Sequence, residues 1–194
     1  MARARDEAKR GAILLAAKHL FARHGFHKTS ISDIKRESGL PVGSIYTYFG
    51  SKDDIMSTII DEGWQELYNR VDQGFNAATT TDARIRILTD AFFSELVHDT
   101  DLISILLTEA IELTRIGAKL DLIMQLVLRL TAVTDQAQLR TAVVVYFLGF
   151  LNAARLSLTG QLGISLEDVR SMMKQLIESS LATLSPPAKV SGPQ

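Results

Sequence analysis

The segment from Gly39 to Asp54, GLPVGSIYTYFGSKDD, limits the possible folds more than any other part of the chain. Its first three residues form a turn that ends a short apolar stretch, in which Ile31 and Ile34 lie on one edge of a helix. A second stretch follows at once, with Ile45 and Phe49 one turn apart and a glycine directly after them. The pattern predicts two short helices joined by a tight turn.

The ends of both short helices carry residues that start helices. Thr29 and Ser30 offer hydroxyl groups that can cap the first helix, and Asp33 lies three residues after Ser30. Pro41 is tolerated where the second helix begins. Two helices joined in this way make a helix-turn-helix, in which the second helix enters the major groove of DNA. The alternative is a helical hairpin whose tyrosines only cover a core.

Length and composition indicate an all-α protein with a sizeable core. The chain has 194 residues, 46% of them hydrophobic, which suits one large domain or a small domain joined to a larger one. Aromatic residues make up only 7%, and Ala, Leu, Ile, Glu and Arg recur, which favours helices over sheet. No cysteine is present, so we expect no disulfide, thiolate metal site or thiol nucleophile.

Charge is distributed unevenly along the chain, although the formal net charge is only -1. Residues 1–52 hold ten Lys and Arg against four Asp and Glu, whereas residues 53–194 hold eleven against eighteen. A basic end is consistent with an anionic partner such as nucleic acid, because phosphate neutralisation supplies most non-specific affinity. A solvated charged face is the alternative when charge is the only clue.

The span from Ile13 to Ile55 resembles the DNA-binding domain of the TetR family of bacterial transcriptional regulators. A helix predicted over residues 6–23 leads into the shared pattern, which is F-x-x-x-G-F, a Thr-Ser pair, I-x-x-x-S-G, and then G-x-I-Y-x-Y-F-x-S-K followed by acidic residues. The resemblance implies an N-terminal three-helix DNA-binding domain and a C-terminal helical domain for ligand binding and dimerisation. It also implies a regulator of transcription, in most cases a repressor, that a small apolar or amphipathic effector releases from a palindromic operator.

The resemblance also implies which residues contact DNA. Thr29 and Ser30 match a cap that touches phosphate, and Lys52 matches a phosphate-binding lysine at a helix start, where free backbone N–H groups also attract anions. Lys35 and Pro41 depart from the usual alanine and serine, so Lys35 would add a backbone contact and Pro41 offers no side-chain cap. The expected DNA-binding residues are Thr29, Ser30, Ser32, Val42, Gly43, Ser44, Tyr46, Thr47, Tyr48 and Lys52. Of these, Val42 can at most touch a thymine methyl group.

Beyond residue 52, apolar spacing predicts helices over about residues 53–77, 82–97, 101–116, 119–133, 135–159 and 166–184. Ser165 and Asp168 occupy capping positions for the last helix. We therefore expect a DNA-binding domain over residues 1–52, from which the helix 53–77 leads out. An effector-binding and dimerisation domain follows over residues 53–185, and a flexible tail over residues 186–194.

The segment from Asp135 to Thr159 is apolar almost all round, with VVVYFLGFL covering every direction of a helix, so it must be covered on more than one side. A partner subunit is the simple explanation, and a central core helix in a monomer is the alternative. The resemblance implies that this helix and the last one pair with their copies in a homodimer, whose two-fold symmetry matches a palindromic operator. The expected interface residues are Phe147, Leu151, Met173, Leu176 and Ile177.

The segment DLISILLTEAIELTRIG places a carboxylate on an apolar helix face. On a helical wheel, Glu109 lies between three leucines on one side and two isoleucines on the other. An unpaired buried carboxylate is unfavourable, so Glu109 requires a partner, a proton or a wet cavity. Two interpretations stand: a structural ion pair, with Arg155 or Asn152 as partner, or a polar anchor in a ligand pocket. The expected ligand-binding residues are Leu102, Leu106, Glu109, Leu113, Asn152 and Arg155.

Other functional classes receive little support from the sequence. The histidines show no HExxH or comparable spacing, and no phosphate loop, G-x-S-x-G elbow or dinucleotide fingerprint is present, so we expect no catalytic residue, metal or cofactor. The most apolar segment, Val143 to Leu151, is short of the roughly 20 residues that a bilayer span needs, so we expect a cytoplasmic protein without a membrane anchor. A DNA-binding factor on the same scaffold without a small-molecule effector is the second alternative.

Overall fold

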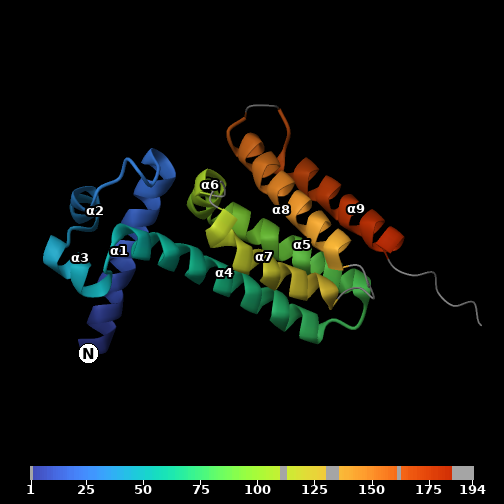
Figure 1. Ribbon diagram of the computed structural model, residues 1–194, viewed down its shortest axis with the longest axis horizontal. Helices are drawn as coiled ribbons and strands as arrows, with labels where there is room; N and C mark the ends of the chain where they lie inside the picture. The colour runs from blue at the N-terminus through green and yellow to red at the C-terminus, as the bar shows by residue number, and fades with distance from the viewer. Residues whose placement is uncertain (1, 110–112, 130–135, 161–162, 185–194) are drawn as a thin grey trace, which may run out of the picture. The chain divides into compact units, whose positions relative to one another are not determined.

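The computed structural model describes residues 2–109, 113–129, 136–160 and 163–184, and the regular structure within these ranges is helical (Figure 1). The helices are α1 (Ala2–His24), α2 (Ile31–Ser38), α3 (Val42–Tyr48), α4 (Lys52–Ala77), α5 (Thr81–His98), α6 (Thr100–Glu109), α7 (Leu113–Leu128), α8 (Gln136–Leu158) and α9 (Leu166–Leu184). The expected all-α fold is confirmed.

Contacts divide the chain into two compact units. The first unit contains residues 1–68 and 95–116, and the second contains residues 69–94 and 117–194. Helices α4, α5 and α7 each contribute residues to both units. The domain boundary that the sequence predicts after residue 52 lies within the first unit.

The core of the first unit forms where α2, α3 and α6 pack against α1. On α1, buried apolar residues recur at helical spacing from Ile13 to Phe21, so the helix presents one continuous stripe to its neighbours. Ile34 of α2 and Ile45 of α3, both expected on inward faces, are fully buried. The two short helices are therefore held by α1, because helices of this length are marginal by themselves.

Helix α6 joins the first unit through close packing and ionic contacts. A Cβ atom added at Gly63 of α4 would lie 2.5 Å from a terminal methyl group of Leu102, so glycine at this position lets α6 approach α4 closely. Lys18 of α1 pairs with Asp99, and His19 Nε2 lies 3.3 Å from an Asp101 carboxylate oxygen.

Several helix ends follow the predicted chemistry. Ser30 and Asp33 form a reciprocal capping box at α2, and Ser165 and Asp168 do the same at α9. At α4 the arrangement is shifted by one residue, because the Asp54 amide donates to Ser51 Oγ while its carboxylate accepts from the Gly50 amide. These contacts satisfy amide groups that have no partner inside the helix.

The predicted break between two helices at residues 117–118 is wrong, because these residues lie inside a helix. Helix α7 is described from Leu113 and continues through Gly117 to Leu128. We placed the break at Gly117, but a single glycine inside a helix costs only about 1 kcal/mol and does not end it.

In the second unit, α8 packs against α9, and Tyr146 shares a hydroxyl hydrogen bond with Ser180. Arg129, which follows α7, pairs with Asp72 and donates to the Asn76 side-chain oxygen of α4 over 2.9 Å. These contacts tie the end of α7 to the last turns of α4.

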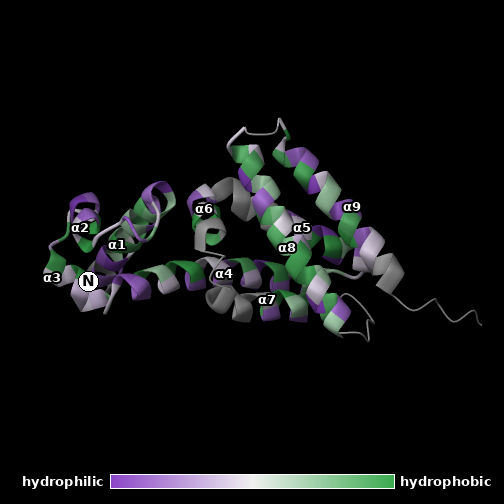
Figure 2. Ribbon diagram, turned by 45° about the horizontal axis from the view of Figure 1, so that its top comes forward, coloured by the Kyte–Doolittle hydropathy of each residue, from purple (hydrophilic) through white to green (hydrophobic). Residues whose placement is uncertain are grey.

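Helix α8 carries mostly apolar residues with polar ones between them (Figure 2), and its apolar part is longer than the segment Val143 to Leu151. Residues 137–158 are long and apolar enough to cross a membrane, although only 28% of their most apolar 18-residue stretch is buried inside the protomer. Core helices of soluble proteins meet the same criterion of length and composition. Arg140 and Arg155 lie within residues 137–158. The outward apolar residues of α8 therefore call for contact with another apolar protein surface.

Candidate DNA-binding surface

Helix α3 separates its residues into a core face and an outward face. Ile45 is fully buried, and Phe49 directly after the helix is 3% exposed. Tyr46 is 54% exposed, and Gly43 and Thr47 are also exposed. The remaining expected contact residues of this helix, Val42, Ser44 and Tyr48, are half-buried at its edges. Hydroxyl and aromatic groups therefore lie on the side of α3 that the core leaves open.

Tyr48 has a partner that the sequence did not indicate. Its hydroxyl donates to the Asp6 carboxylate of α1 over 2.7 Å. The pKa of Tyr48 is raised above its ordinary value, mainly because this hydrogen bond favours the protonated phenol. The contact joins residues 42 positions apart, so no local pattern could have shown it.

Lys52 lies at the start of α4, as expected, and its ammonium group faces the turn between α1 and α2. It donates to the carbonyl oxygens of Phe26 over 2.7 Å and of Thr29 over 2.8 Å. The nitrogen also lies 4.3 Å from the centre of the Phe26 ring, which adds a cation–π contact. Lys52 therefore fixes the turn that precedes α2, and the third N–H of its ammonium group is left for an anion.

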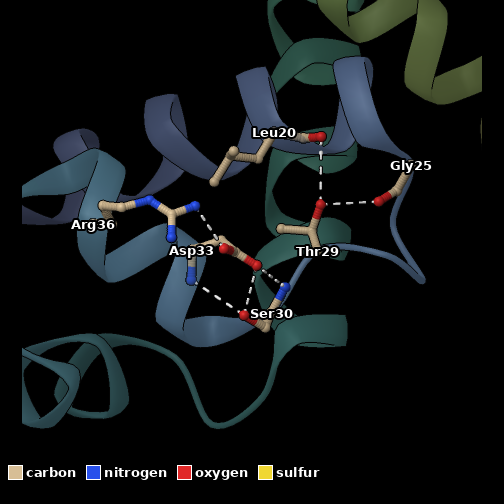
Figure 3. A network of polar contacts seen from close by, with 6 residues as sticks. All are labelled: Leu20, Gly25, Thr29, Ser30, Asp33 and Arg36. Carbon is tan, nitrogen blue, oxygen red and sulfur yellow. Dashed lines mark hydrogen bonds and ion pairs between the residues drawn. The ribbon is translucent and has the colours of Figure 1, made fainter.

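The start of α2 is a network of polar contacts, shown in Figure 3. The Asp33 carboxylate accepts from the Ser30 amide and hydroxyl over 3.0 and 2.6 Å and from Arg36 over 2.7 Å. These bonds, led by the Ser30 hydroxyl, lower the pKa of Asp33 from 3.8 to about 2. The network makes Asp33 an anion at any physiological pH.

Thr29 is placed differently from Ser30. It is only 3% exposed, and its hydroxyl donates to the Gly25 carbonyl over 2.9 Å. Burial keeps this hydroxyl away from a phosphate in this conformation, so we revise its expected role from a phosphate contact to holding the turn. Ser30 and Ser32 are exposed at the start of α2 and keep the role that we predict for them.

The residues expected to bind a ligand fall in different parts of the chain. Leu102 and Leu106 are buried in the first unit, whereas Asn152 and Arg155 are exposed on α8 and share a hydrogen bond of 3.3 Å. The side chains of Glu109 and Leu113 lie outside the described residues.

Two of the expected interface residues require correction. Phe147 and Leu151 are buried within the protomer, so neither offers much surface to a partner. Leu176 is 40% exposed, and Met173 and Ile177 are half-buried. The sequence missed Val145, which is 58% exposed on α8, because a helix that is apolar all round does not show which side faces out.

Arg84 of α5 is a further residue that sequence reasoning missed. Its Nε atom is buried and has no hydrogen-bond partner among the described residues. A buried donor of this kind calls for an acceptor such as water or a ligand. An isolated arginine in a helical pattern gives no signal of this environment.

Comparison with known proteins identifies the N-terminal part of the chain. The family model for bacterial regulatory proteins of the tetR family matches residues 13–59, which include α2, α3 and the start of α4. The N-terminal part of the chain therefore carries a TetR-family DNA-binding domain. The helix-turn-helix of this part is a DNA-binding element.

Similar proteins include a regulator of fatty acid metabolism and a transcriptional activator. The chain is 28% identical over 90 residues to the fatty acid metabolism regulator protein of Bacillus subtilis, a match that covers 46% of each chain. It is 29% identical over 96 residues to the transcriptional activator FasR of Mycolicibacterium smegmatis, covering 50% of this chain and 43% of that one. The match thus spans less than half the length of these curated relatives.

The similarity in fold extends over most of the chain. The crystal structure of the regulator FadR from Bacillus subtilis in complex with stearoyl-CoA is similar with a TM-score of 0.71 at 18% identity, covering 88% of this chain and 97% of that one. At this identity the likeness establishes a common fold, with the helix-turn-helix followed by a helical C-terminal part.

Proposed function

We propose that this chain is a homodimeric cytoplasmic regulator of the TetR family that binds a palindromic operator through α3 and is released by a small amphipathic effector. The observation that carries the DNA-binding part is the division of α3 into two faces. Ile45 anchors the helix in the core, while Tyr46, Thr47 and Gly43 remain exposed for contacts with bases and phosphates.

The dimer is supported by apolar surface on the last two helices. Val145 of α8 and Met172 and Leu176 of α9 are exposed, although they are large and apolar. Exposed apolar surface on a helix pair that packs together marks an interaction site. A two-fold interface there would present two copies of α3 to two half-sites of the same sequence.

An amphipathic effector is supported by the relatives. The similar FadR protein was crystallised with stearoyl-CoA, and one sequence relative is named as a regulator of fatty acid metabolism. We therefore propose a long-chain acyl thioester as the first effector class to test. The ligand would prefer a state in which the two α3 helices are wrongly spaced for successive major grooves.

Titration of the protein–operator complex with stearoyl-CoA tests this part of the proposal, with free coenzyme A as a control for the polar half of the ligand. We expect stearoyl-CoA to lower DNA occupancy in a saturable manner and coenzyme A alone to leave it unchanged. An effect that appears equally with coenzyme A would contradict an amphipathic pocket.

The second candidate is a DNA-binding factor that has no effector. It predicts a chain that binds its operator with the same affinity in the presence of every ligand tested.

We also propose that the regulator represses transcription. A reporter gene placed behind the operator separates repression from activation.

A further inference from the structure

A hollow of about 420 Å³ lies in the first unit between the end of α1 and the first turns of α2. Its lining includes Arg23, His24, Lys28 and Arg36, against Asp33 as the only carboxylate among the lining residues. With the histidine neutral, three full positive charges face one negative charge. The hollow is therefore basic.

Three of these basic side chains are unpaired. Within the ranges that the structure describes, Arg23, His24 and Lys28 are exposed and make no hydrogen bond or ion pair. Three other basic residues of α1 have carboxylate partners, which are Glu62 for Arg10, Asp99 for Lys18 and Asp101 for His19. Among the described residues, the three basic groups at the hollow have no such partner and remain available.

The carboxylate in the lining does not cancel this charge. Both oxygens of Asp33 accept hydrogen bonds, one from Ser30 and the other from Arg36 (Figure 3). The Thr29 hydroxyl on the buried side donates to main-chain carbonyls and offers nothing to a ligand. Recognition in the hollow must therefore come from the long cationic side chains at its rim.

We propose that this hollow binds a phosphate group of the DNA backbone beside the surface covered by α3. The inference rests on the proposed DNA-binding function and extends its contact area. Arg36 follows Ser32 by one helical turn on the same side of α2, so the hollow adjoins the expected DNA surface. Lys28 lies two residues before the Ser30 cap, where the partial positive charge of the helix start adds to its own.

The hollow is better suited to the DNA backbone than to a small anion that it would have to enclose. Sites for small ligands bury most of the ligand surface and fix it with a few placed polar groups. Here the cations stand on exposed side chains and the buried side has no free donor. Such a rim suits a polyanion that passes over it, in which each contact releases counterions and carries no sequence information.

The test measures how affinity for a mixed-sequence duplex depends on salt concentration. We expect Arg23→Ala and Lys28→Ala each to reduce the slope of log K against log salt by about 0.9, the value for one lost phosphate contact. Arg23→Lys keeps the charge and should retain the slope of the parent. Arg86→Ala is the matched control, because it removes an exposed arginine that pairs only with Asp82 of its own helix.

Because Arg23 and Lys28 lack partners in the protein, both alanine variants should keep the melting temperature of the parent. Unchanged slopes in both variants would overturn the inference while leaving the proposed function intact, provided that the parent binds the duplex. A parent that does not bind duplex DNA at all would defeat both. Unchanged slopes together with NMR shifts of His24 on addition of inorganic phosphate, absent in Arg23→Ala, would assign the hollow to a free anion instead.

Discussion

Tyr48, which we expect to contact DNA, makes a hydrogen bond within the protein when DNA is absent. Its hydroxyl donates to Asp6, so a phosphate oxygen must replace that carboxylate as the acceptor. In the parent, DNA binding replaces the hydrogen bond from Tyr48 to Asp6 with one from Tyr48 to a phosphate, and the exchange favours binding by about 1 kcal/mol. Tyr48→Phe can make neither bond, so we expect it to weaken binding to all DNA sequences by about fivefold. Fluorescence anisotropy with specific and mixed-sequence duplexes measures this change.

The control for Tyr48 is Asp6→Ala, which removes the protein partner and leaves the hydroxyl free. If the tyrosine acts on phosphate, this variant should bind at least as tightly as the parent. Weaker binding in both variants would instead assign the tyrosine a role in holding α1 against α3.

Lys52 has a structural role in addition to the expected phosphate contact. We expect Lys52→Ala to lower the free energy of unfolding by about 1–2 kcal/mol, because it removes two hydrogen bonds from a charged donor to main-chain carbonyls. It should also reduce the salt slope of DNA binding by about one. Urea unfolding of this variant is compared with Lys174→Ala, whose exposed pair with Glu178 should contribute little. A changed stability with an unchanged salt slope would leave Lys52 a structural role only.

At the scale of the element, the cap of α2 predicts a pH dependence. The folded-state pKa of Asp33 is lowered from 3.8 to about 2, so its contribution to stability is present above the higher value and is lost as the pH falls between the two. Asp33→Asn should therefore remove part of the acid destabilisation in this window. Thermal unfolding at a series of pH values measures it, and identical pH profiles for parent and variant would contradict the capping role.

Elements were predictable from the sequence where local chemistry decides them. Ser30 with Asp33, the turn at Gly39 and the spacing of Ile45 and Phe49 set the helix-turn-helix, because caps and short apolar periods act within a few residues. The course of α7 through Gly117 was not predicted, because a glycine resembles a helix end although it costs a helix interior only about 1 kcal/mol. The partners of Tyr48 and Lys52 depend on tertiary contacts, which no local pattern contains.

At the scale of the whole molecule, the exposed apolar residues of α8 and α9 predict the oligomeric state. We expect the parent to sediment as a dimer at micromolar concentration. Val145→Glu and Leu176→Glu should raise the dimer Kd by at least about 100-fold, because an unpaired charge in a closed apolar interface costs several kcal/mol. Phe147→Glu is the contrasting variant, and it should impair folding because that residue is buried within the protomer. A parent that sediments as a monomer would contradict the dimer.

Selection of bound fragments from genomic DNA tests the central claim, which is that a dimer reads an operator through the outward face of α3. The account predicts enrichment of one inverted repeat whose half-sites lie about one helical turn of DNA apart, 34–36 Å. It also predicts that Ser44→Ala and Thr47→Ala alter the bases preferred within each half-site, whereas Tyr48→Phe weakens binding to all sequences alike. Enrichment of no sequence, or of a sequence that the α3 variants select unchanged, would contradict it.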